Sequence, residues 1–161
     1  MGFKKGIRQG YYEPKFPDKW VITEAFDSKG VPGIKYRSSW EKKFMLFCDY
    51  NPNILKANSE GVVIPYISPK DGKQHKYYLD FFIRVKRNND KGYKDYIVEV
   101  KPLAETLPPK EPRNNSEKSY NNYKKAIETY AVNQAKWEYA TIWAEKQGVE
   151  FIIITEKELG I

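Results

Sequence analysis

Two acidic side chains and one lysine stand where β-strands would normally carry apolar residues. Residues 77–85 and 96–101 are rich in aromatic and β-branched residues, which is typical of strands. Side chains alternate between the two faces of a strand, so Glu99 and Lys101 point the same way. If the two strands pair with Asp80 opposite Glu99 or Lys101, all three side chains converge.

This convergence has a chemical use. Two carboxylates form a hard, anionic oxygen site that suits Mg²⁺ or Mn²⁺. Such an ion can activate a water and neutralise the charge that builds up on a phosphate. A lysine beside it can orient or deprotonate the attacking water, because a desolvated lysine can lose its proton near neutral pH. The spacing alone is equally compatible with a solvated sheet face that carries a surface ion pair.

The composition bounds the class of protein. The 161 residues have the length of one domain. With 28 basic and 21 acidic residues the net charge is +7, which suits nucleic acid, although a membrane surface or solubility would also account for it. The single Cys48 excludes an internal disulfide, and with only one histidine, His75, a zinc site is not expected. No apolar run approaches the roughly 20 residues of a membrane span, and no signal peptide is seen, so no membrane attachment is expected.

The first half of the chain predicts one helix and one strand before Asp80. Ser38 or Ser39 can cap the helix, which continues with apolar residues at helical spacing. Asn51-Pro52 ends it. Residues 62–66 predict the first strand.

The second half predicts a loop, a long helix and a last strand. Residues 102–117 carry four prolines in a polar, charged segment and predict a loop. Residues 119–147 give the longest helical pattern, and Gln134 is the polar exception on its apolar stripe. A helix packed across the sheet would bring Gln134 toward the acids, to hold a phosphate or a water, or it is a core glutamine bonded to backbone. Gly148 ends the helix, and residues 151–155 predict a fully buried strand.

The N-terminal part has a different character. Residues 1–20 mix glycine, proline and aromatic residues with five basic and two acidic side chains. They predict an extended arm, which either contacts DNA or a protein partner or lies on the surface as an ordinary terminus. Residues 21–35 predict an irregular connection. We therefore divide the chain into a basic arm with its connection, residues 1–35, and a folded domain, residues 36–161.

The order helix, strand, strand, strand, helix, strand predicts an α/β fold in which helices cover a mixed central sheet. Asp80, followed 19 residues later by Glu99-x-Lys101, resembles the motif of the PD-(D/E)xK nuclease superfamily, with Leu79 where a proline usually precedes the acid. Longer stretches resemble the head-completion proteins of T4-like tailed phages and, more distantly, TnsA-type transposon endonucleases. These stretches are YRSSWEKKFMLFCDYNP, EGVVIPYISPKDGKQHKYYLDFF, VEVKP, NQAKWEYA and FIIITEKEL.

The resemblance implies a restriction-endonuclease-like core and a metal-dependent DNA endonuclease that hydrolyses phosphodiester bonds. Asp80 and Glu99 would bind Mg²⁺ (or Mn²⁺) together with the backbone carbonyl of Val100. Lys101 would position or activate the attacking water.

The resemblance also implies a supporting acid. The superfamily often places it on the first helix, which points to Glu41, whereas the similar phage proteins carry a glutamate at the position of Glu60. The two compete for this role. Each also has a plain structural explanation, since Glu41 suits the positive end of a helix and Glu60 suits a solvent-facing loop.

The implied biological role is completion of a phage head, including processing of DNA ends after packaging. The partners would be DNA and head, portal or neck proteins, in the host cytoplasm during assembly and in the head or neck of the virion. The alternative is a non-catalytic head or neck protein that retains a nuclease fold, because fold does not settle function. A transposase-like subunit is a third interpretation, but it would need a partner subunit, and the chain shows no additional DNA-recognition domain.

Overall fold

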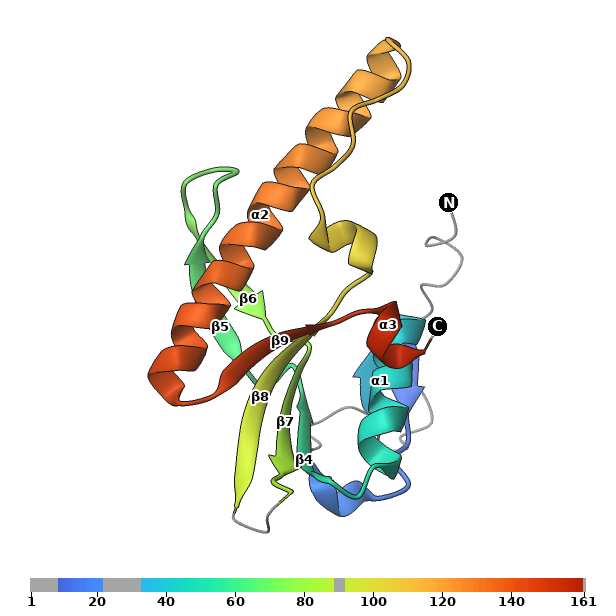
Figure 1. Cartoon of the computed structure of the whole chain (residues 1–161), viewed down its shortest axis with the longest axis vertical. Coiled ribbons are helices and arrows are strands. Elements are labelled where there is room, and N and C mark those ends of the chain that lie inside the picture. Colours follow the sequence, from blue (N-terminus) through green and yellow to red (C-terminus); the bar gives the residue numbers. More distant parts are fainter. Residues whose placement is uncertain (1–8, 22–32, 89–91, 161) are drawn as a thin grey trace.

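The computed structural model describes residues 9–21, 33–88 and 92–160. A five-stranded mixed sheet with the order β2-β4-β7-β8-β9 lies at its centre (Figure 1). β7 runs antiparallel to β4 on one side and to β8 on the other. The two outer strands are parallel to their neighbours, β2 to β4 and β9 to β8. The strands are β2 (Trp20–Val21), β4 (Ile54–Ser59), β7 (Phe81–Lys86), β8 (Tyr93–Val100) and β9 (Glu150–Ile154).

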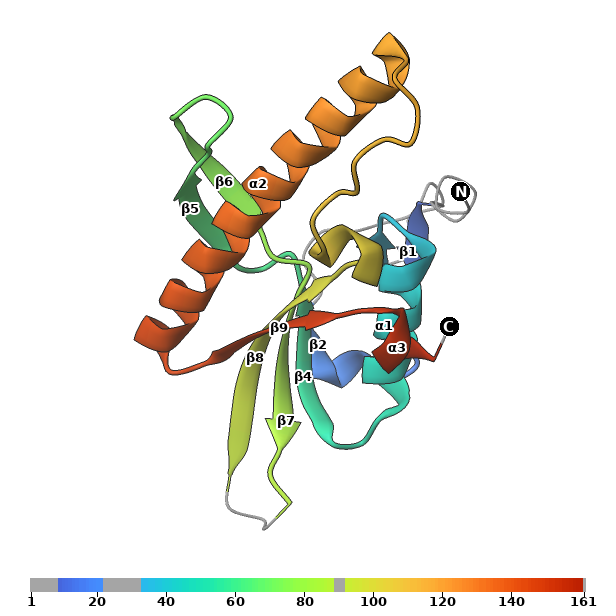
Figure 2. The same cartoon turned by 45° about the horizontal axis from the view of Figure 1, so that its top comes forward.

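Each face of the sheet is covered by one helix and one two-stranded ribbon (Figures 1 and 2). Helix α1 and the ribbon β1–β3 cover one face, and helix α2 and the ribbon β5–β6 cover the other. These elements are α1 (Ser39–Tyr50), α2 (Glu117–Gln147), β1 (Gly10–Tyr12), β3 (Ile34–Tyr36), β5 (Val63–Ile67) and β6 (Gln74–Tyr78). A short helix, α3 (Glu156–Leu159), follows β9, and 3-10 turns η2 (Pro17–Lys19) and η3 (Leu103–Thr106) lie in connections.

The two faces have separate apolar clusters. On the α1 side, Phe44 packs against Phe81 of β7 with ring centroids 4.9 Å apart, and Val98 of β8 joins them. On the α2 side, Ile97 packs with Trp137. Ile97 and Val98 are neighbours in β8, so the alternation of a strand sends their side chains into opposite clusters. The sheet is thus buried on both sides near its centre.

Both predicted ends of α1 and the predicted end of α2 are confirmed. The Ser38 hydroxyl accepts the N–H of Glu41 at 3.1 Å and caps α1, which ends at Asn51. α2 begins two residues earlier than predicted, after its cap Ser116. It ends at Gly148, whose φ of 71° is the left-handed conformation that glycine adopts readily.

The predicted strands before Asp80 were partly wrong. Residues 63–67 do form a strand, but β5 pairs with β6 outside the central sheet. The run 77–85 is not one strand, because the chain leaves the ribbon at Leu79–Asp80 and enters the sheet as β7. The first strand of the central sheet after α1 is β4, which the sequence did not predict. A register shift between Ile54 and Lys56 interrupts its side-chain alternation.

The N-terminal segment is more regular than expected where it is described. β1, β2 and β3 fall within residues 1–35 or at their end, and Tyr12 and Trp20 are buried in the α1-side cluster. Residues 1–8 of the predicted arm and 22–32 of the predicted connection lie outside the described residues. The division of the chain at residue 36 stays a prediction.

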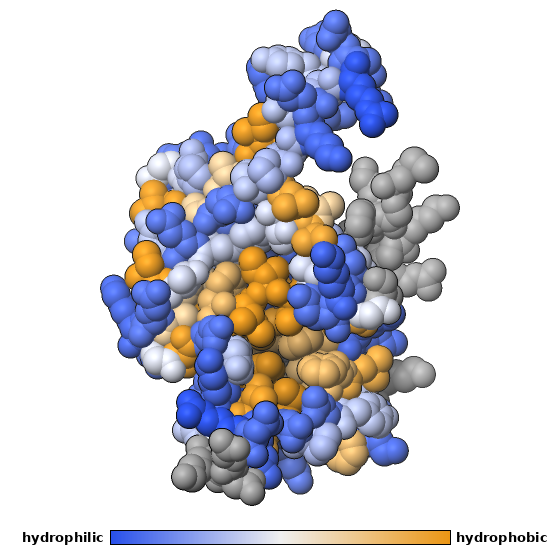
Figure 3. Space-filling model, viewed as in Figure 1, coloured by the Kyte–Doolittle hydropathy of each residue, from blue (hydrophilic) through white to orange (hydrophobic). Residues whose placement is uncertain are grey.

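The last strand is less buried than predicted. β9 is an edge of the sheet, and its residues 151–154 are all partly exposed. Hydrophobic atoms accordingly reach the surface in the middle of the face seen in Figure 3. The prediction of a fully buried strand was wrong, although its position in the chain was right.

Helix α2 extends beyond the rest of the fold (Figures 1 and 2). Its 31 residues span about 46 Å at about 1.5 Å per residue. The buried positions all lie from Asn133 onward, while Tyr120 and Ile127 in the projecting half are exposed. Over the described ranges, no helix is long and apolar enough to cross a membrane.

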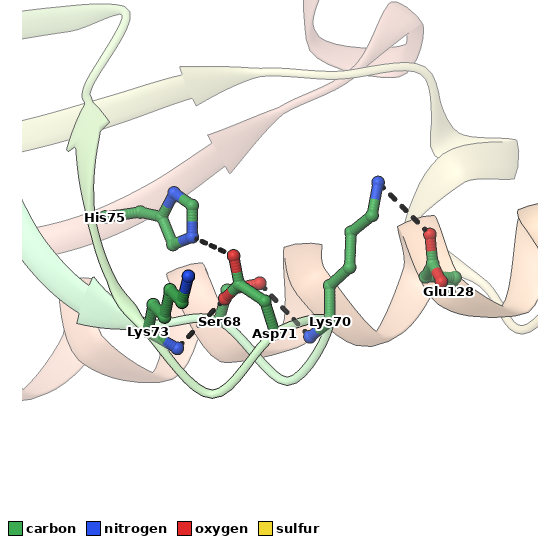
Figure 4. A network of polar contacts seen from close by, with 6 residues as sticks. All are labelled: Ser68, Lys70, Asp71, Lys73, His75 and Glu128. Carbon is green, nitrogen blue, oxygen red and sulfur yellow. Dashed lines mark hydrogen bonds and ion pairs between the residues drawn. The ribbon is translucent and has the colours of Figure 1, made fainter.

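The tip of the ribbon β5–β6 is held by polar contacts (Figure 4). Asp71 accepts the N–H of Lys73 at 2.9 Å and pairs with His75 at 2.8 Å. Lys70 reaches Glu128 of α2, with 3.4 Å between Nζ and Oε1. These groups are exposed, so each pair contributes little to stability. Of these contacts, the Lys70–Glu128 pair is the one that joins the tip to α2.

Candidate active site

The register of β7 and β8 brings the predicted acids together. Phe81 pairs with Val98, so Asp80, just before β7, lies beside Glu99 near the end of β8. Oδ2 of Asp80 accepts the backbone N–H of Val100 at 2.8 Å. The Nζ of Lys101 lies 3.7 Å from Oε1 of Glu99. The structure therefore assembles the group that the sequence motif predicted.

Asp80 and Glu99 disturb each other's ionisation. Burial, followed by the negative charges of Glu99 and Glu41, raises the pKa of Asp80 well above its ordinary value. Burial also raises the pKa of Glu99, while Lys101 and a hydrogen bond from Tyr77 act in the opposite direction. Two carboxylates held together with too little positive charge around them are expected to favour a bound cation.

Tyr77 holds Glu99 from the ribbon. Its hydroxyl donates to Oε2 of Glu99 at 2.8 Å, and both side chains are buried. Burial and the charge of Glu99 raise the pKa of Tyr77, so the phenol stays a donor. The ribbon β5–β6 thus orients Glu99 through the hydroxyl of Tyr77. It also positions Asp80, which lies two residues after the end of β6.

Glu41 and Glu60, the two candidate supporting acids, differ in what they contact. Glu41 is 8% exposed, accepts the backbone N–H of Arg37 at 3.0 Å, and its charge acts on Asp80. Burial raises the pKa of Glu41. The carboxylate of Glu60 instead forms an ion pair with the side chain of Arg37. Glu41 is therefore the acid whose charge acts on Asp80.

Glu60 has a backbone role at the site. Its N–H donates to the carbonyl oxygen of Asp80 at 3.1 Å. Its φ of 56° is left-handed, a conformation that costs a residue with a side chain on the order of 1 kcal/mol. This turn joins β4 to β5 and fixes the main chain where Asp80 leaves the ribbon.

Gln134 is not brought to the acids. It is exposed, and its predicted place on the buried stripe was wrong, because the stripe consists of Asn133, Trp137, Ala140 and Ala144. Lys136 is the residue of α2 whose charge acts on Glu99 and Asp80. At about 100° per residue, Gln134 lies about 160° around the helix from Lys136. Lys136 was not among the predicted site residues.

The donor set fits Mg²⁺ better than an ion that needs a complete protein cage. Among the described residues, no group of three or more His, Cys, Asp or Glu side chains is arranged to hold a metal ion. Mg²⁺ commonly uses one or two carboxylates and completes its shell with waters and substrate phosphates. Asp80 and Glu99 supply two such carboxylates, and the adjoining peptide of Val100 offers a carbonyl oxygen.

A mixed sheet flanked by helices, with an acid pair and a lysine where two central strands meet, defines the restriction-endonuclease-like class of nucleases, and the predicted fold class is confirmed. Residues 51–156 match the family of TnsA-like endonuclease N-terminal domains. The chain is also 36% identical over 145 residues to the "Head completion nuclease" of Enterobacteria phage T4, covering 89% of this chain and 93% of that protein. The chain belongs to the TnsA-like endonuclease family, and the predicted resemblance is confirmed.

Proposed function

We propose that this protein is a metal-dependent deoxyribonuclease that hydrolyses phosphodiester bonds within DNA. The observation that supports it most is the convergence of Asp80, Glu99 and Lys101 at one end of two paired strands. All three lie in the segment 51–156 that matches the endonuclease family. The net charge of +7 suits a DNA substrate.

Each residue has a proposed task. Asp80, Glu99 and the carbonyl of Val100 would hold Mg²⁺ (or Mn²⁺), which would supply Lewis-acid stabilisation of the phosphate. Lys101 positions the attacking water as the ammonium or, as the neutral amine, accepts its proton, and Glu99 lies beside the Nζ of Lys101 at 3.7 Å. Glu41, rather than Glu60, is the supporting acid, because its charge acts on Asp80.

The proposed biological role is completion of a phage head, in which the nuclease processes DNA ends after packaging. The similar phage T4 protein carries the name head completion nuclease. Head, portal or neck proteins are the proposed partners, in the host cytoplasm and in the virion. Particles assembled with an Asp80→Asn protein should then contain DNA with unprocessed ends, whereas normal ends would favour a purely structural role.

The buried acid pair argues against the non-catalytic alternative. Burying two interacting carboxylates without a full set of partners destabilises a fold. A purely structural head or neck protein gains nothing from the loss of stability that the buried carboxylates of Asp80 and Glu99 cause. A metal-dependent nuclease needs the two carboxylates, because their negative charge binds the ion.

The direct test is cleavage of linear and supercoiled DNA with Mg²⁺ or Mn²⁺. The wild type is expected to cut, and Asp80→Asn and Lys101→Met are expected to lose the activity. Asp71→Asn, which removes an exposed charge at the ribbon tip, is the matched control and should cut normally. Failure of the wild type to cut, together with no ion bound in a titration, would contradict the proposal.

A further inference from the structure

A lysine of α2, Lys136, lies near the acid pair, because its charge and those of Glu99 and Asp80 act on each other. The Nζ of Lys136 lies 5.5 Å from the ring centroid of Tyr77 and 5.7 Å from that of Tyr66. Both rings are buried, at 4% and 6% exposure, and the lysine itself is only partly exposed. The long side chain therefore crosses the junction between the helix and the ribbon β5–β6.

The ammonium of Lys136 forms no ion pair with a carboxylate of the described residues. In the described part of the chain it has no carboxylate within the 4.0 Å of an ion pair. Burial lowers the pKa of Lys136, while the charges of Glu99 and Asp80 act to raise it. Withdrawing an ammonium from water without a hydrogen-bonded partner is costly, and two aromatic faces offset only part of that cost.

Tyr77 connects this lysine to the candidate catalytic group. Its ring lies next to the Lys136 ammonium, while its hydroxyl donates to Glu99 at 2.8 Å. Lys101, the residue after β8, reaches the same carboxylate at 3.7 Å. The acid pair therefore has one lysine that is engaged with Glu99 and a second lysine that is held near it without direct contact.

We propose that Lys136 binds a non-bridging oxygen of the scissile phosphate when DNA enters the site. This inference rests on the proposed nuclease function and adds a substrate-binding residue to it. A phosphate held between the acid pair and α2 supplies the anionic partner that the ammonium lacks in the protein alone. The ammonium would then stabilise the negative charge that accumulates on the phosphate oxygens during hydrolysis.

The proposal separates the roles of the two lysines. Lys101 acts on the water through its position beside Glu99, whereas Lys136 acts on the phosphate. A structural role for Lys136, as a packing link between Tyr66 and Tyr77, would instead affect only the stability of the fold. Removal of its charge at nearly constant length distinguishes the two.

The experiment compares wild type with Lys136→Met and Lys136→Arg, using Lys146→Met as the control. Lys146 is exposed and lies ten residues further along the same helix, about 15 Å away. A DNA duplex is the probe, with cleavage measured in Mg²⁺ and binding measured in Ca²⁺ over a range of salt concentrations. Thermal unfolding and Mn²⁺ titration report on folding and on the ion site.

Lys136→Met is expected to lower kcat by about 10²-fold, as for other groups that stabilise charge in the transition state. The slope of log binding constant against log salt concentration should fall by about 1, the change expected for one lost phosphate contact. Mn²⁺ binding should persist, Lys136→Arg should recover part of the activity, and Lys146→Met should match wild type. An unchanged kcat and salt slope in Lys136→Met would overturn the proposal.

A measurement on the wild type covers the case in which Lys136→Met does not fold. DNA should protect Lys136, but not Lys146, from acetylation followed by mass spectrometry. Equal labelling of Lys136 with and without DNA would overturn the proposal, whether or not the protein cuts. Absence of cutting by wild type would count instead against the nuclease function itself.

Discussion

Asp49, a buried carboxylate on α1, holds the N-terminal segment against the fold. It is 1% exposed and accepts four hydrogen bonds. Oδ2 accepts the Tyr12 hydroxyl and the N–H of Lys15, the latter at 2.7 Å. Oδ1 accepts the N–H of Phe16 at 3.1 Å and the indole N–H of Trp20 at 3.2 Å. One side chain thus organises the whole stretch from β1 to β2.

Asp49→Asn should destabilise the protein strongly. The new amide group replaces one acceptor oxygen. On the Oδ2 side it faces the N–H of Lys15, which loses its acceptor, whereas the Tyr12 hydroxyl can turn and accept from the amide. A hydrogen bond to a charged group contributes about 1.5–3 kcal/mol, so the loss of the bond from Lys15 predicts a destabilisation of about that size or more. Tyr12→Phe, which removes a single hydrogen bond to the carboxylate, should cost a similar amount.

The pH dependence follows from the same contacts. Burial acts to raise the pKa of Asp49, but the hydrogen bonds from Tyr12 and its neighbours outweigh burial and lower it. A carboxyl whose pKa is lower in the folded state stabilises the fold above its unfolded pKa of about 3.9, and that stabilisation is lost as the pH falls through the folded pKa. The stability difference between wild type and Asp49→Asn should therefore be constant above about pH 4 and shrink below it.

Urea unfolding followed by tryptophan fluorescence measures both effects. Asp18→Asn removes the same charge from an exposed position in η2 and is the matched control. A difference below about 1 kcal/mol between wild type and Asp49→Asn, or a difference that persists unchanged far below pH 4, would refute the reasoning. Because Asp49 is not part of the acid pair, the folded fraction of Asp49→Asn should retain cleavage.

Three further predictions concern the site. Tyr77→Phe removes the hydrogen bond to Glu99 and should cost about 1.5–3 kcal/mol of stability and lower the cleavage rate; unchanged values of both in urea unfolding and kinetics would contradict the role of Tyr77. Mn²⁺ at 100 times its Kd should stabilise wild type by about 2.7 kcal/mol in thermal unfolding but should not stabilise Asp80→Asn, and equal shifts would place the ion elsewhere. Glu41→Gln should lower cleavage more than Glu60→Gln, and the reverse order would make Glu60 the supporting acid.

The sequence predicted the elements whose local signals agree with the fold. Ser38, Asn51 and Gly148 mark helix ends through side-chain or backbone properties that act within a few residues, so these predictions hold. The break at Leu79–Asp80 has no such local signal, because the run around it contains neither glycine nor proline. Only the pairing of β6 with β5 and of β7 with β8 separates the two strands.

The same distinction applies to the site. The alternation within β8 sufficed to place Glu99 and Lys101 on one face, and the motif supplied Asp80 as their partner. Lys136 was missed because the predicted stripe ran through Gln134, whereas the buried face of α2 runs through Asn133. The spacing of Trp137, Ala140 and Ala144 is the signal that identifies the buried face. How far a helix extends past its sheet is set by tertiary structure, and so is the edge position of β9.

The location of Mn²⁺ in a crystal tests the central claim most directly. Anomalous scattering from a crystal soaked in Mn²⁺ should show one ion within about 2.0–2.2 Å of oxygens from Asp80, Glu99 and the Val100 carbonyl, the coordination distances of such small, hard cations. The same soak of Asp80→Asn should show the peak lost or strongly weakened. A wild-type crystal with no ion between Asp80 and Glu99, or with the ion bound at other residues, would contradict the account.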